Sequence, residues 1–465
     1  MVTRRPFLAM GAALMFGSGM ASGADAAGFA GEWFGALDLG SQQLRLKLVV
    51  ADGPRATLYS LDQGGAPIPA GETRIDRDRI FVTWPVISAR YEGQLTGGKI
   101  VGTFTQGSAL PLTFAREQQA STAVQPLTLA GLAKLRADAG APALAAAGLN
   151  RNGRRIAFAE GRRAVNRPEA VTPADTWHLG SNTKSMTATL VARLVEAGQI
   201  GWSDTVSQVL GSAIADMRAD YRDVSFRHLL SHRSGLAGNI DIAELIQFPR
   251  ESADARADRI AFARKVLTRA PAGRKEAHFE YSNSGYVVAG AMLEAKLGAP
   301  WETLMREHVL APLKMVGAGF GAPGKPGAFD QPVGHAVTAA GVLEPFPPGG
   351  PITDNPAVLG PAGRVHAPLS DVLAYLSAHC FRTPFLRAES WQMLHTAPFG
   401  GDYALGWVRR GDALWHNGSN TLWYAEMLAD PKRGVVAAVA ANDGRIGVMT
   451  PVVGKALVGA AAAVG

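Results

Sequence analysis

Ser181 and Lys184 form a Ser-x-x-Lys pair whose side chains could carry out nucleophilic catalysis. Large apolar residues recur after Lys184 at helical spacing, and Gly198 ends the run, so we predict a helix that reaches Ala197. Residues three apart share a helix face, so the lysine amine can lie against the serine hydroxyl. A serine at a helix start also lies near unpaired N–H groups, which stabilise an anion. Taken alone, this common pattern is more often a helix N-cap beside a surface lysine.

Two further stretches carry polar residues that could complete such a site. Tyr281 and Asn283 precede a predicted helix at residues 287–297, and His416, Gly418 and Ser419 lie between two predicted strands. Each stretch alone has a structural explanation: an aromatic anchor with an N-cap, or a strand residue that satisfies a turn. Their occurrence together with the Ser-x-x-Lys pair favours a shared catalytic site instead.

The three stretches resemble the motifs of the serine β-lactamase and penicillin-binding-protein-like hydrolases of the class C type. This group includes DD-carboxypeptidases, D-aminopeptidases and family VIII esterases. Its motifs Ser-x-x-Lys, Tyr-x-Asn and Lys- or His-x-Gly occur here in the same order. The connecting residues 227–236, 312–315 and 360–363 also match, and the resemblance covers about residues 127 to 444.

The resemblance implies hydrolysis through an acyl-enzyme on Ser181. It favours Tyr281 as the base that takes the serine proton, passes it to the leaving group and then activates water. The chemistry of the residues leaves Lys184 open as the acylation base. Burial favours a neutral lysine amine, whereas a lysine cation favours a tyrosinate, and either form is a usable base.

The resemblance also implies how a substrate would be held. Asn283 would contact the lysine and a substrate amide or carbonyl, and the backbone N–H groups of Ser181 and Ser419 would bind the oxyanion. His416, followed by Gly418, would border the pocket at the acyl or carboxylate end of the substrate. Class C β-lactamases have a lysine where this chain has His416, whereas esterase and peptidase members commonly have a histidine.

These features predict a serine hydrolase that cleaves an ester or a D-amino-acid-type amide. A DD-carboxypeptidase or a weak β-lactamase is the alternative among enzymes. A non-catalytic cell-wall or partner-binding protein on the same fold is the alternative from another class. The expected partner is a small ester, amide or peptidoglycan-derived substrate, and the oligomeric state stays open.

The spacing of apolar residues divides the chain into two domains, and the second domain carries these motifs. Apolar residues at positions 44, 46, 48 and 50 alternate with other residues, and turn signals recur at short intervals. We therefore predict a small β-barrel or sandwich of about seven or eight strands at residues 27–118. It would be a packing or spacer module, or it would bind carbohydrate or cell wall. A polar linker is expected at residues 117–125.

Residues 119–465 are predicted to form the catalytic domain. Strand patterns near both of its ends and helices between them predict an α+β fold, with one antiparallel sheet flanked by helices and a helical subdomain. The resemblance makes this fold β-lactamase/transpeptidase-like. The Pro- and Gly-rich tract at residues 345–361 is expected to run irregularly over the surface near the site.

The start of the chain has the features of an export signal. Arg4 and Arg5 precede an apolar stretch of about 14 residues, which is short of the roughly 20 that cross a bilayer. A small-residue cleavage site follows at residues 24–26. The pattern resembles a twin-arginine signal, so we expect removal of residues 1–26 and a periplasmic or secreted protein without a stable membrane span. An uncleaved membrane anchor is the alternative.

Composition excludes several other functions. A formal net charge of +7 spread over 465 residues is no nucleic-acid footprint. Cys380 is the single cysteine, so no internal disulfide is expected and a buried inert thiol is predicted. His228 and His232 have the spacing of a zinc pair, but no glutamate follows His228, so packing or loop contacts are expected and no metal or cofactor. The chain has no Gly-x-Ser-x-Gly, which argues against an α/β-hydrolase.

Overall fold

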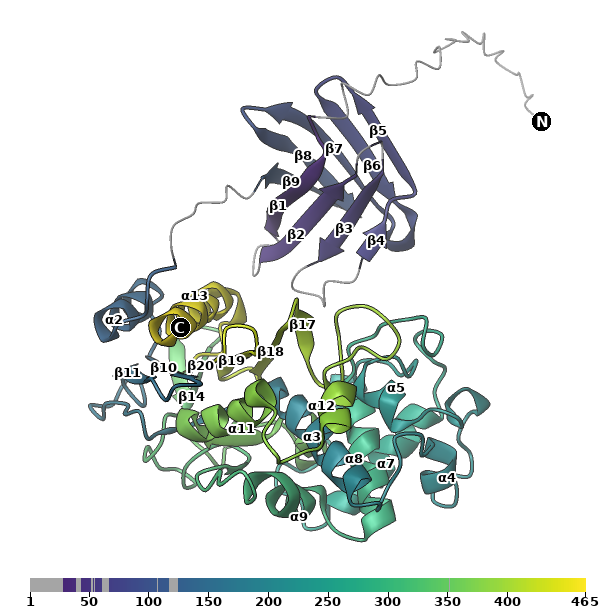
Figure 1. Cartoon of the computed structure of the whole chain (residues 1–465), viewed down its shortest axis with the longest axis vertical. Coiled ribbons are helices and arrows are strands. Elements are labelled where there is room, and N and C mark those ends of the chain that lie inside the picture. Colours follow the sequence, from purple (N-terminus) through teal and green to yellow (C-terminus); the bar gives the residue numbers. More distant parts are fainter. Residues whose placement is uncertain are drawn as a thin grey trace, which may run out of the picture. The chain divides into compact units, whose positions relative to one another are not determined.

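The structure is a computed structural model that describes residues 28–38, 43–51, 53, 55–60, 67–106, 108–116, 124–350 and 352–465 (Figure 1). The chain forms two compact units, which divide between Ala120 and Ser121. The predicted export signal and most of the predicted linker lie outside the described residues.

In the described part of the N-terminal unit, the strands form one antiparallel sheet in the order β4-β3-β2-β1-β9-β8-β7-β6-β5. The bounds are β1 (Gly31–Asp38), β2 (Gln43–Val50), β3 (Ala56–Ser60), β4 (Pro67–Pro69), β5 (Glu72–Asp76), β6 (Arg79–Trp84), β7 (Ala89–Thr96), β8 (Lys99–Gln106) and β9 (Ser108–Ala115), with a 3₁₀ turn at Pro85–Ile87. This architecture confirms the predicted all-β character, with slightly more strands than expected.

The two edges of this sheet meet, which makes it a curled, barrel-like sheet. Edge strands β4 and β5 are separated in the sequence only by Ala70 and Gly71. The Ala70 N–H donates to the Ala56 carbonyl of β3, and the Gly71 N–H donates to the Thr83 carbonyl of β6. A two-residue connection therefore bonds to both halves of the sheet and holds its edges together. Buried Trp33, Trp84, Tyr91 and Phe114 lie among the side chains that fill the interior.

The C-terminal unit is built on a six-stranded antiparallel sheet in the order β11-β10-β20-β19-β18-β17. Its strands are β10 (Ala143–Asn150), β11 (Arg155–Gly161), β17 (Val408–Arg410), β18 (Ala413–Ser419), β19 (Tyr424–Asp430) and β20 (Val435–Ala441). The first two come from the start of the unit and the rest from its end, which confirms the predicted sheet. Smaller sheets join β12 (Thr176–His178), β16 (Val365–Pro368) and β13 (Gly319–Phe320), and β14 (Gly334–Val337) with β15 (Leu343–Phe346).

Helices cover both faces of the six-stranded sheet (Figure 1). Along β20, Val435 and Val439 pack with α13 (Ile446–Val464), whereas Val436 and Ala438 pack with the core that contains α3 (Thr183–Glu196) and α11 (Leu369–Phe381). This alternation is the period of a strand that is buried on both faces. Among the described helices, α13 alone is long and apolar enough to cross a membrane, and a core helix passes the same test.

Between β11 and β17 the chain is mainly helical. The remaining helices are α2 (Leu129–Asp138), α3 (Thr183–Glu196), α4 (Val206–Leu210), α5 (Phe226–Leu230), α6 (Ile242–Leu245), α7 (Ala255–Leu267), α8 (Asn283–Leu297), α9 (Trp301–Met305), α10 (Gly360–Gly363), α11 (Leu369–Phe381) and α12 (Ala388–Leu394). Short 3₁₀ turns occur at η2 (Gly180–Asn182), η3 (Ala219–Tyr221) and η5 (Ala357–Leu359), and η4 (Arg306–Leu310) is a π turn.

Three local predictions need correction. The strand expected at residues 403–409 is shorter, because Gly406 has a φ of 78° and turns the chain against α3. Helix α8 begins four residues before the predicted position, because the Ser282 hydroxyl caps its first turn. The tract expected on the surface is largely buried from Thr353 onward, where Asp354 is only 7 % exposed and Val358 fully buried.

Candidate active site

Ser181 lies in the tight turn η2, which leads directly into α3. Gly180 has a φ of 52°, a conformation that other residues rarely adopt. A methyl group at Gly180 would lie 2.4 Å from the Ser419 nitrogen, and one at Gly418 would lie 2.4 Å from the Ser181 nitrogen. The turn and β18 therefore meet backbone to backbone, and the N–H groups of Ser181 and Ser419 lie close together.

Lys184 is fully buried in the first turn of α3. Its Nζ lies 2.9 Å from Ser181 Oγ, 2.6 Å from Asn283 Oδ1 and 2.8 Å from the Ala362 carbonyl oxygen. Burial lowers the pKa of Lys184 well below its usual range. A neutral amine has two protons and one lone pair, and the amide and carbonyl oxygens can only accept. In the charged form Nζ donates to Ser181 Oγ, and in the neutral form its lone pair faces that hydroxyl and can accept its proton.

Tyr281 approaches Ser181 and Lys184 from the loop before α8. Lys184 Nζ lies 4.9 Å from the centre of the Tyr281 ring, and the phenol and Ser181 share a hydrogen bond. Burial of the hydroxyl raises the pKa of Tyr281 more than this hydrogen bond lowers it. The phenol therefore keeps its proton beside the serine, while Tyr281 as a whole residue is 38 % exposed.

The orientation of Asn283 depends on Asn239, a residue that the sequence did not single out. The Asn283 amide nitrogen donates to Asn239 Oδ1 at 2.8 Å, which turns the Asn283 oxygen toward Lys184. Asn239 precedes α6 in a loop without a periodic pattern. The only sequence signal was its place a few residues after the predicted connector at residues 227–236.

His416 lies on β18 but has little open surface for a substrate. It is 2 % exposed, and its Nδ1 lies 2.6 Å from the Asn417 carbonyl oxygen. The carbonyl can only accept, so Nδ1 carries the proton and Nε2 accepts from the Tyr403 hydroxyl at 3.0 Å. Burial, together with the nearby Lys184, lowers the pKa of His416 to about 3, so the ring is neutral.

Tyr403 connects the second and third motifs, which the sequence did not predict. Its ring packs edge-on against Tyr281, with ring centres 6.3 Å apart, and its hydroxyl bonds to His416. His232 lies between these aromatic rings, 4.4 Å from Tyr281 and 4.5 Å from Tyr403. The His232 Nδ1 also accepts the Ser282 N–H at 2.9 Å, so the histidine holds the loop that carries Tyr281.

His228, the other histidine of the pair with zinc-like spacing, also makes structural contacts. His228 bonds to Ser225 and, through Nε2, lies 3.0 Å from Glu276. Across the described ranges, no group of three or more His, Cys, Asp or Glu side chains is arranged to hold a metal ion. Cys380 is buried, and burial raises the pKa of its thiol to about 12, as expected for an inert group.

The C-terminal unit is similar to known proteins. Residues 131–449 match the family model described as Beta-lactamase. Penicillin-binding protein 4 of Amycolatopsis lactamdurans is 29% identical over 300 residues, which cover 59% of this chain and 74% of the relative. The unguisins hydrolase ungD' of Aspergillus campestris is 25% identical over 297 residues, which cover 58% of this chain and 53% of the relative.

Solved structures share the fold of the C-terminal unit. EstCE1, a hydrolase with promiscuous acyltransferase activity, aligns with a TM-score of 0.59 and 19% identity over 72% of this chain and 97% of its own. The D-amino acid amidase from Ochrobactrum anthropi aligns with a TM-score of 0.58 and 19% identity over 71% of this chain and 97% of its own. At these identities the likeness shows the fold alone, whereas the family model spans more than half of the sequence. The chain therefore belongs to the Beta-lactamase family and is a serine hydrolase of that family.

Proposed function

We propose that this enzyme cleaves esters or D-amino-acid-type amides through an acyl-enzyme on Ser181, with Lys184 as the acylation base. The three contacts of the Lys184 amine carry this proposal, because two of its partners only accept and the third is the serine hydroxyl. The raised pKa of Tyr281 and the lowered pKa of Lys184 support the lysine over the tyrosine as the first base.

In the acylation step, Ser181 Oγ attacks the substrate carbonyl carbon while its proton passes to Lys184 Nζ. The oxyanion that forms is bound by the N–H groups of Ser181 and Ser419, and one such donor contributes about 2.7–4 kcal/mol in comparable sites. Tyr281 then donates its proton to the leaving oxygen or nitrogen as that bond breaks. The products of this step are the released alcohol or amine, an acylated serine, a lysine cation and a tyrosinate.

In the deacylation step, the tyrosinate at Tyr281 takes a proton from water, and the hydroxide attacks the acyl carbon. The lysine cation at Lys184 returns its proton to Ser181 Oγ as the ester bond breaks. Both groups regain their starting protonation states, so the cycle balances. The cation and the tyrosinate stabilise each other between the two steps, since opposite charges close together favour the ionised forms.

The environment of His416 supports a neutral substrate. A carboxylate on the substrate would need a cation in the pocket, and the neutral His416 ring is already bonded on both nitrogens. This favours a neutral ester or amide over a β-lactam or a DD-peptide, which present a carboxylate. A hydrolase with promiscuous acyltransferase activity and a D-amino acid amidase on the same fold support this range of chemistry.

A substrate panel tests the proposal. The enzyme should turn over p-nitrophenyl acetate and D-phenylalanine amide, with much lower kcat/KM for D-Ala-D-Ala peptides and penicillins. Ser181→Ala is the control and should abolish all turnover without loss of fold. Absence of turnover by folded wild-type protein on every ester and amide would favour the non-catalytic alternative, and release of D-alanine as the fastest reaction would favour the carboxypeptidase.

We also propose that residues 1–26 direct export to the periplasm or the medium. The paired arginines Arg4 and Arg5 and the short apolar stretch after them support this address. Fractionation of cells that express a C-terminally tagged chain should find it outside the cytoplasm. Replacing both arginines with lysine should retain it inside, and unchanged export of that variant would argue against a twin-arginine route.

A further inference from the structure

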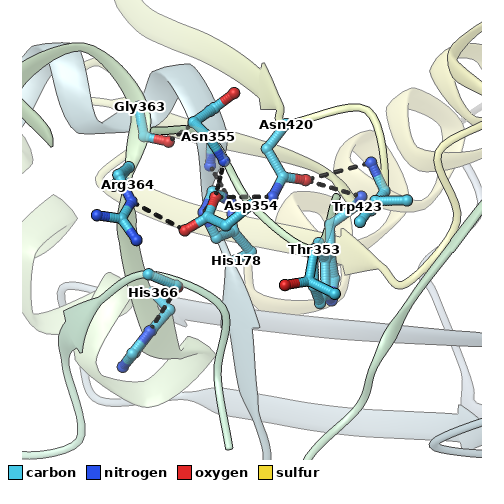
Figure 2. Close-up of polar contacts among 12 residues, drawn as sticks. His178, Thr353, Asp354, Asn355, Gly363, Arg364, His366, Asn420 and Trp423 are labelled. Atoms are coloured by element: carbon cyan, nitrogen blue, oxygen red, sulfur yellow. Dashed lines mark hydrogen bonds and ion pairs between the residues drawn. The ribbon is translucent and has the colours of Figure 1, made fainter. Parts of the chain in front are cut away.

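Asp354 is a buried carboxylate on which separate segments of the C-terminal unit converge (Figure 2). Its Oδ1 lies 3.0 Å from His178 Nε2 and accepts from the Asn420 amide at 3.0 Å and from the Asn355 N–H at 2.7 Å. Its Oδ2 accepts from Arg364 Nε at 3.0 Å. A buried charge with this many partners is fixed in position, because each partner would lose a bond if it moved.

One set of contacts runs from Asp354 to the nucleophile turn. His178 Nδ1 accepts the Gly180 N–H at 3.1 Å, so the proton of the neutral ring is on Nε2, which lies 3.0 Å from Asp354 Oδ1. The Gly180 N–H sets this tautomer, and the carboxylate beside Nε2 favours the same tautomer and orientation of the ring. The ring in turn holds Gly180, whose left-handed conformation directs the next residue, Ser181, toward β18.

A second set of contacts runs from the same carboxylate to the other side of the site. The Asn420 amide donates to Asp354, and its oxygen accepts the N–H groups of Leu422 and Trp423, each at 3.2 Å. These bonds fix the turn between β18 and β19, immediately after Ser419. The Trp423 ring also stacks on His178, with ring centres 5.5 Å apart, so the two sets of contacts meet (Figure 2).

Arg364 and His178 keep the carboxylate charged. Burial alone would raise the pKa of Asp354, but His178, Arg364 and Asn420 outweigh it and hold the pKa well below its usual range. Arg364 is itself held by Glu251, at 3.0 Å, and its side chain is only 6 % exposed. The Asp354 carboxylate is therefore always available as an acceptor for the side chains of His178 and Asn420, which it orients.

We propose that Asp354 is a positioning residue that sets the spacing of the two oxyanion-binding N–H groups, on Ser181 and Ser419, through His178 and Asn420. This inference rests on the proposed acyl-enzyme function of the same site. Its bonds lead to the two backbone turns, so it acts on the geometry of the donors and leaves the proton transfers to Lys184 and Tyr281. Because the oxyanion develops in the transition state, a shift of these donors should lower kcat and leave KM nearly unchanged.

Asp354→Asn tests the proposal in the full-length chain with p-nitrophenyl acetate. We expect kcat to fall about 10- to 100-fold, since ångström-scale misplacement and loss of one donor have effects of this size or larger. The KM should stay within about threefold, a difference under 1 kcal/mol. Asp175→Asn is the matched control. Asp175 is 2 % exposed and bonded to Arg163, so this variant also perturbs a buried carboxylate–arginine pair. In the described part of the chain, Asp175 makes no bond to the turn at Ser181 or to the turn after Ser419. The control should keep kcat within about threefold.

A double-mutant cycle separates a positioning role from general loosening. Because Asp354 acts through both His178 and Asn420, the kcat loss of the Asp354→Asn/His178→Ala double variant should be clearly smaller than the product of the two single losses. Independent effects would multiply instead, which would overturn the proposal. Wild-type kcat in a folded Asp354→Asn protein would also overturn it.

His178→Asn keeps the test decisive if Asp354→Asn does not fold. Its oxygen can still accept the Gly180 N–H, but the contact with Asp354 is lost, so we expect a fall in kcat at unchanged KM. A wild-type kcat in that variant would contradict the proposal. Ser181→Ala distinguishes failure of the proposed function from failure of this inference. Residual turnover by Ser181→Ala would argue against an acyl-enzyme on Ser181, whereas the kcat of the Asp354 variants tests the positioning role alone.

Discussion

Lys184→Arg is the substitution that most directly separates the two possible acylation bases. A guanidinium stays protonated at any accessible pH and has no lone pair to accept a proton. The positive charge remains beside Tyr281, where it would favour a tyrosinate. If the tyrosine were the first base, arginine would therefore preserve part of the activity. If the lysine is the base, arginine cannot replace it.

The size of the expected effect follows from the contacts of the amine. Lys184 Nζ is the group that lies 2.9 Å from Ser181 Oγ, and loss of a positioned general base costs about 10²–10⁴ in rate. The Asn283 and Ala362 oxygens would keep a donor in the arginine variant, so the loss falls mainly on proton transfer. We therefore expect kcat to fall about 10³-fold, or about 4 kcal/mol of transition-state stabilisation.

The assay is the pH dependence of kcat/KM for p-nitrophenyl acetate in wild-type and variant proteins. Because burial lowers the pKa of Lys184, the wild-type rate should fall as the amine is protonated, at a pH well below the ordinary lysine pKa of about 10.4. That acidic limb should be missing from the residual rate of Lys184→Arg. Retention of more than about a tenth of the wild-type rate by the folded variant would refute the lysine as the base.

Two further substitutions test other parts of the mechanism. Tyr281→Phe should slow hydrolysis of an amide or alkyl ester by about 10²–10⁴. Acylation by a p-nitrophenyl ester should slow much less, because nitrophenolate leaves without a proton. Equal losses on both substrates would contradict the role of Tyr281 as the acid. Gly418→Ala should abolish activity or folding, because its methyl group would lie 2.2 Å from the Leu179 carbonyl oxygen and 2.4 Å from the Ser181 nitrogen. Thermal unfolding would reveal a loss of folding, and labelling of Ser181 would reveal a loss of activity. A variant with normal stability and labelling would contradict the close packing of β18.

Local spacing accounts for the parts of the site that the sequence predicted. Ser181 and Lys184 lie three residues apart where the turn η2 leads into α3, so their contact needs little from the rest of the fold. The six-stranded sheet was predicted for a similar reason, since apolar runs broken by turn residues mark its strands near both ends of the unit. The contacts of the Lys184 amine could not be predicted, because two of its partners, Ala362 and Asn283, are distant in the sequence.

The residues that the sequence missed depend on long-range packing. Asp354 lies in a Pro- and Gly-rich tract without a period, and only the folded chain brings it to His178 and Asn420. His228 and His232 looked like neighbours on one helix face, but α5 ends at Leu230 and His232 has a φ of 60°. The left-handed turn takes His232 away from His228 and places it among the aromatic rings beside Tyr281.

Covalent trapping on Ser181 tests the central claim most directly. The protein is incubated with a fluorophosphonate, and the labelled peptide is identified by mass spectrometry. We expect one label per chain, on Ser181, with loss of labelling in Ser181→Ala and slow labelling in Lys184→Arg. A label on another residue, or undiminished labelling of the folded Ser181→Ala protein, would contradict the acyl-enzyme mechanism.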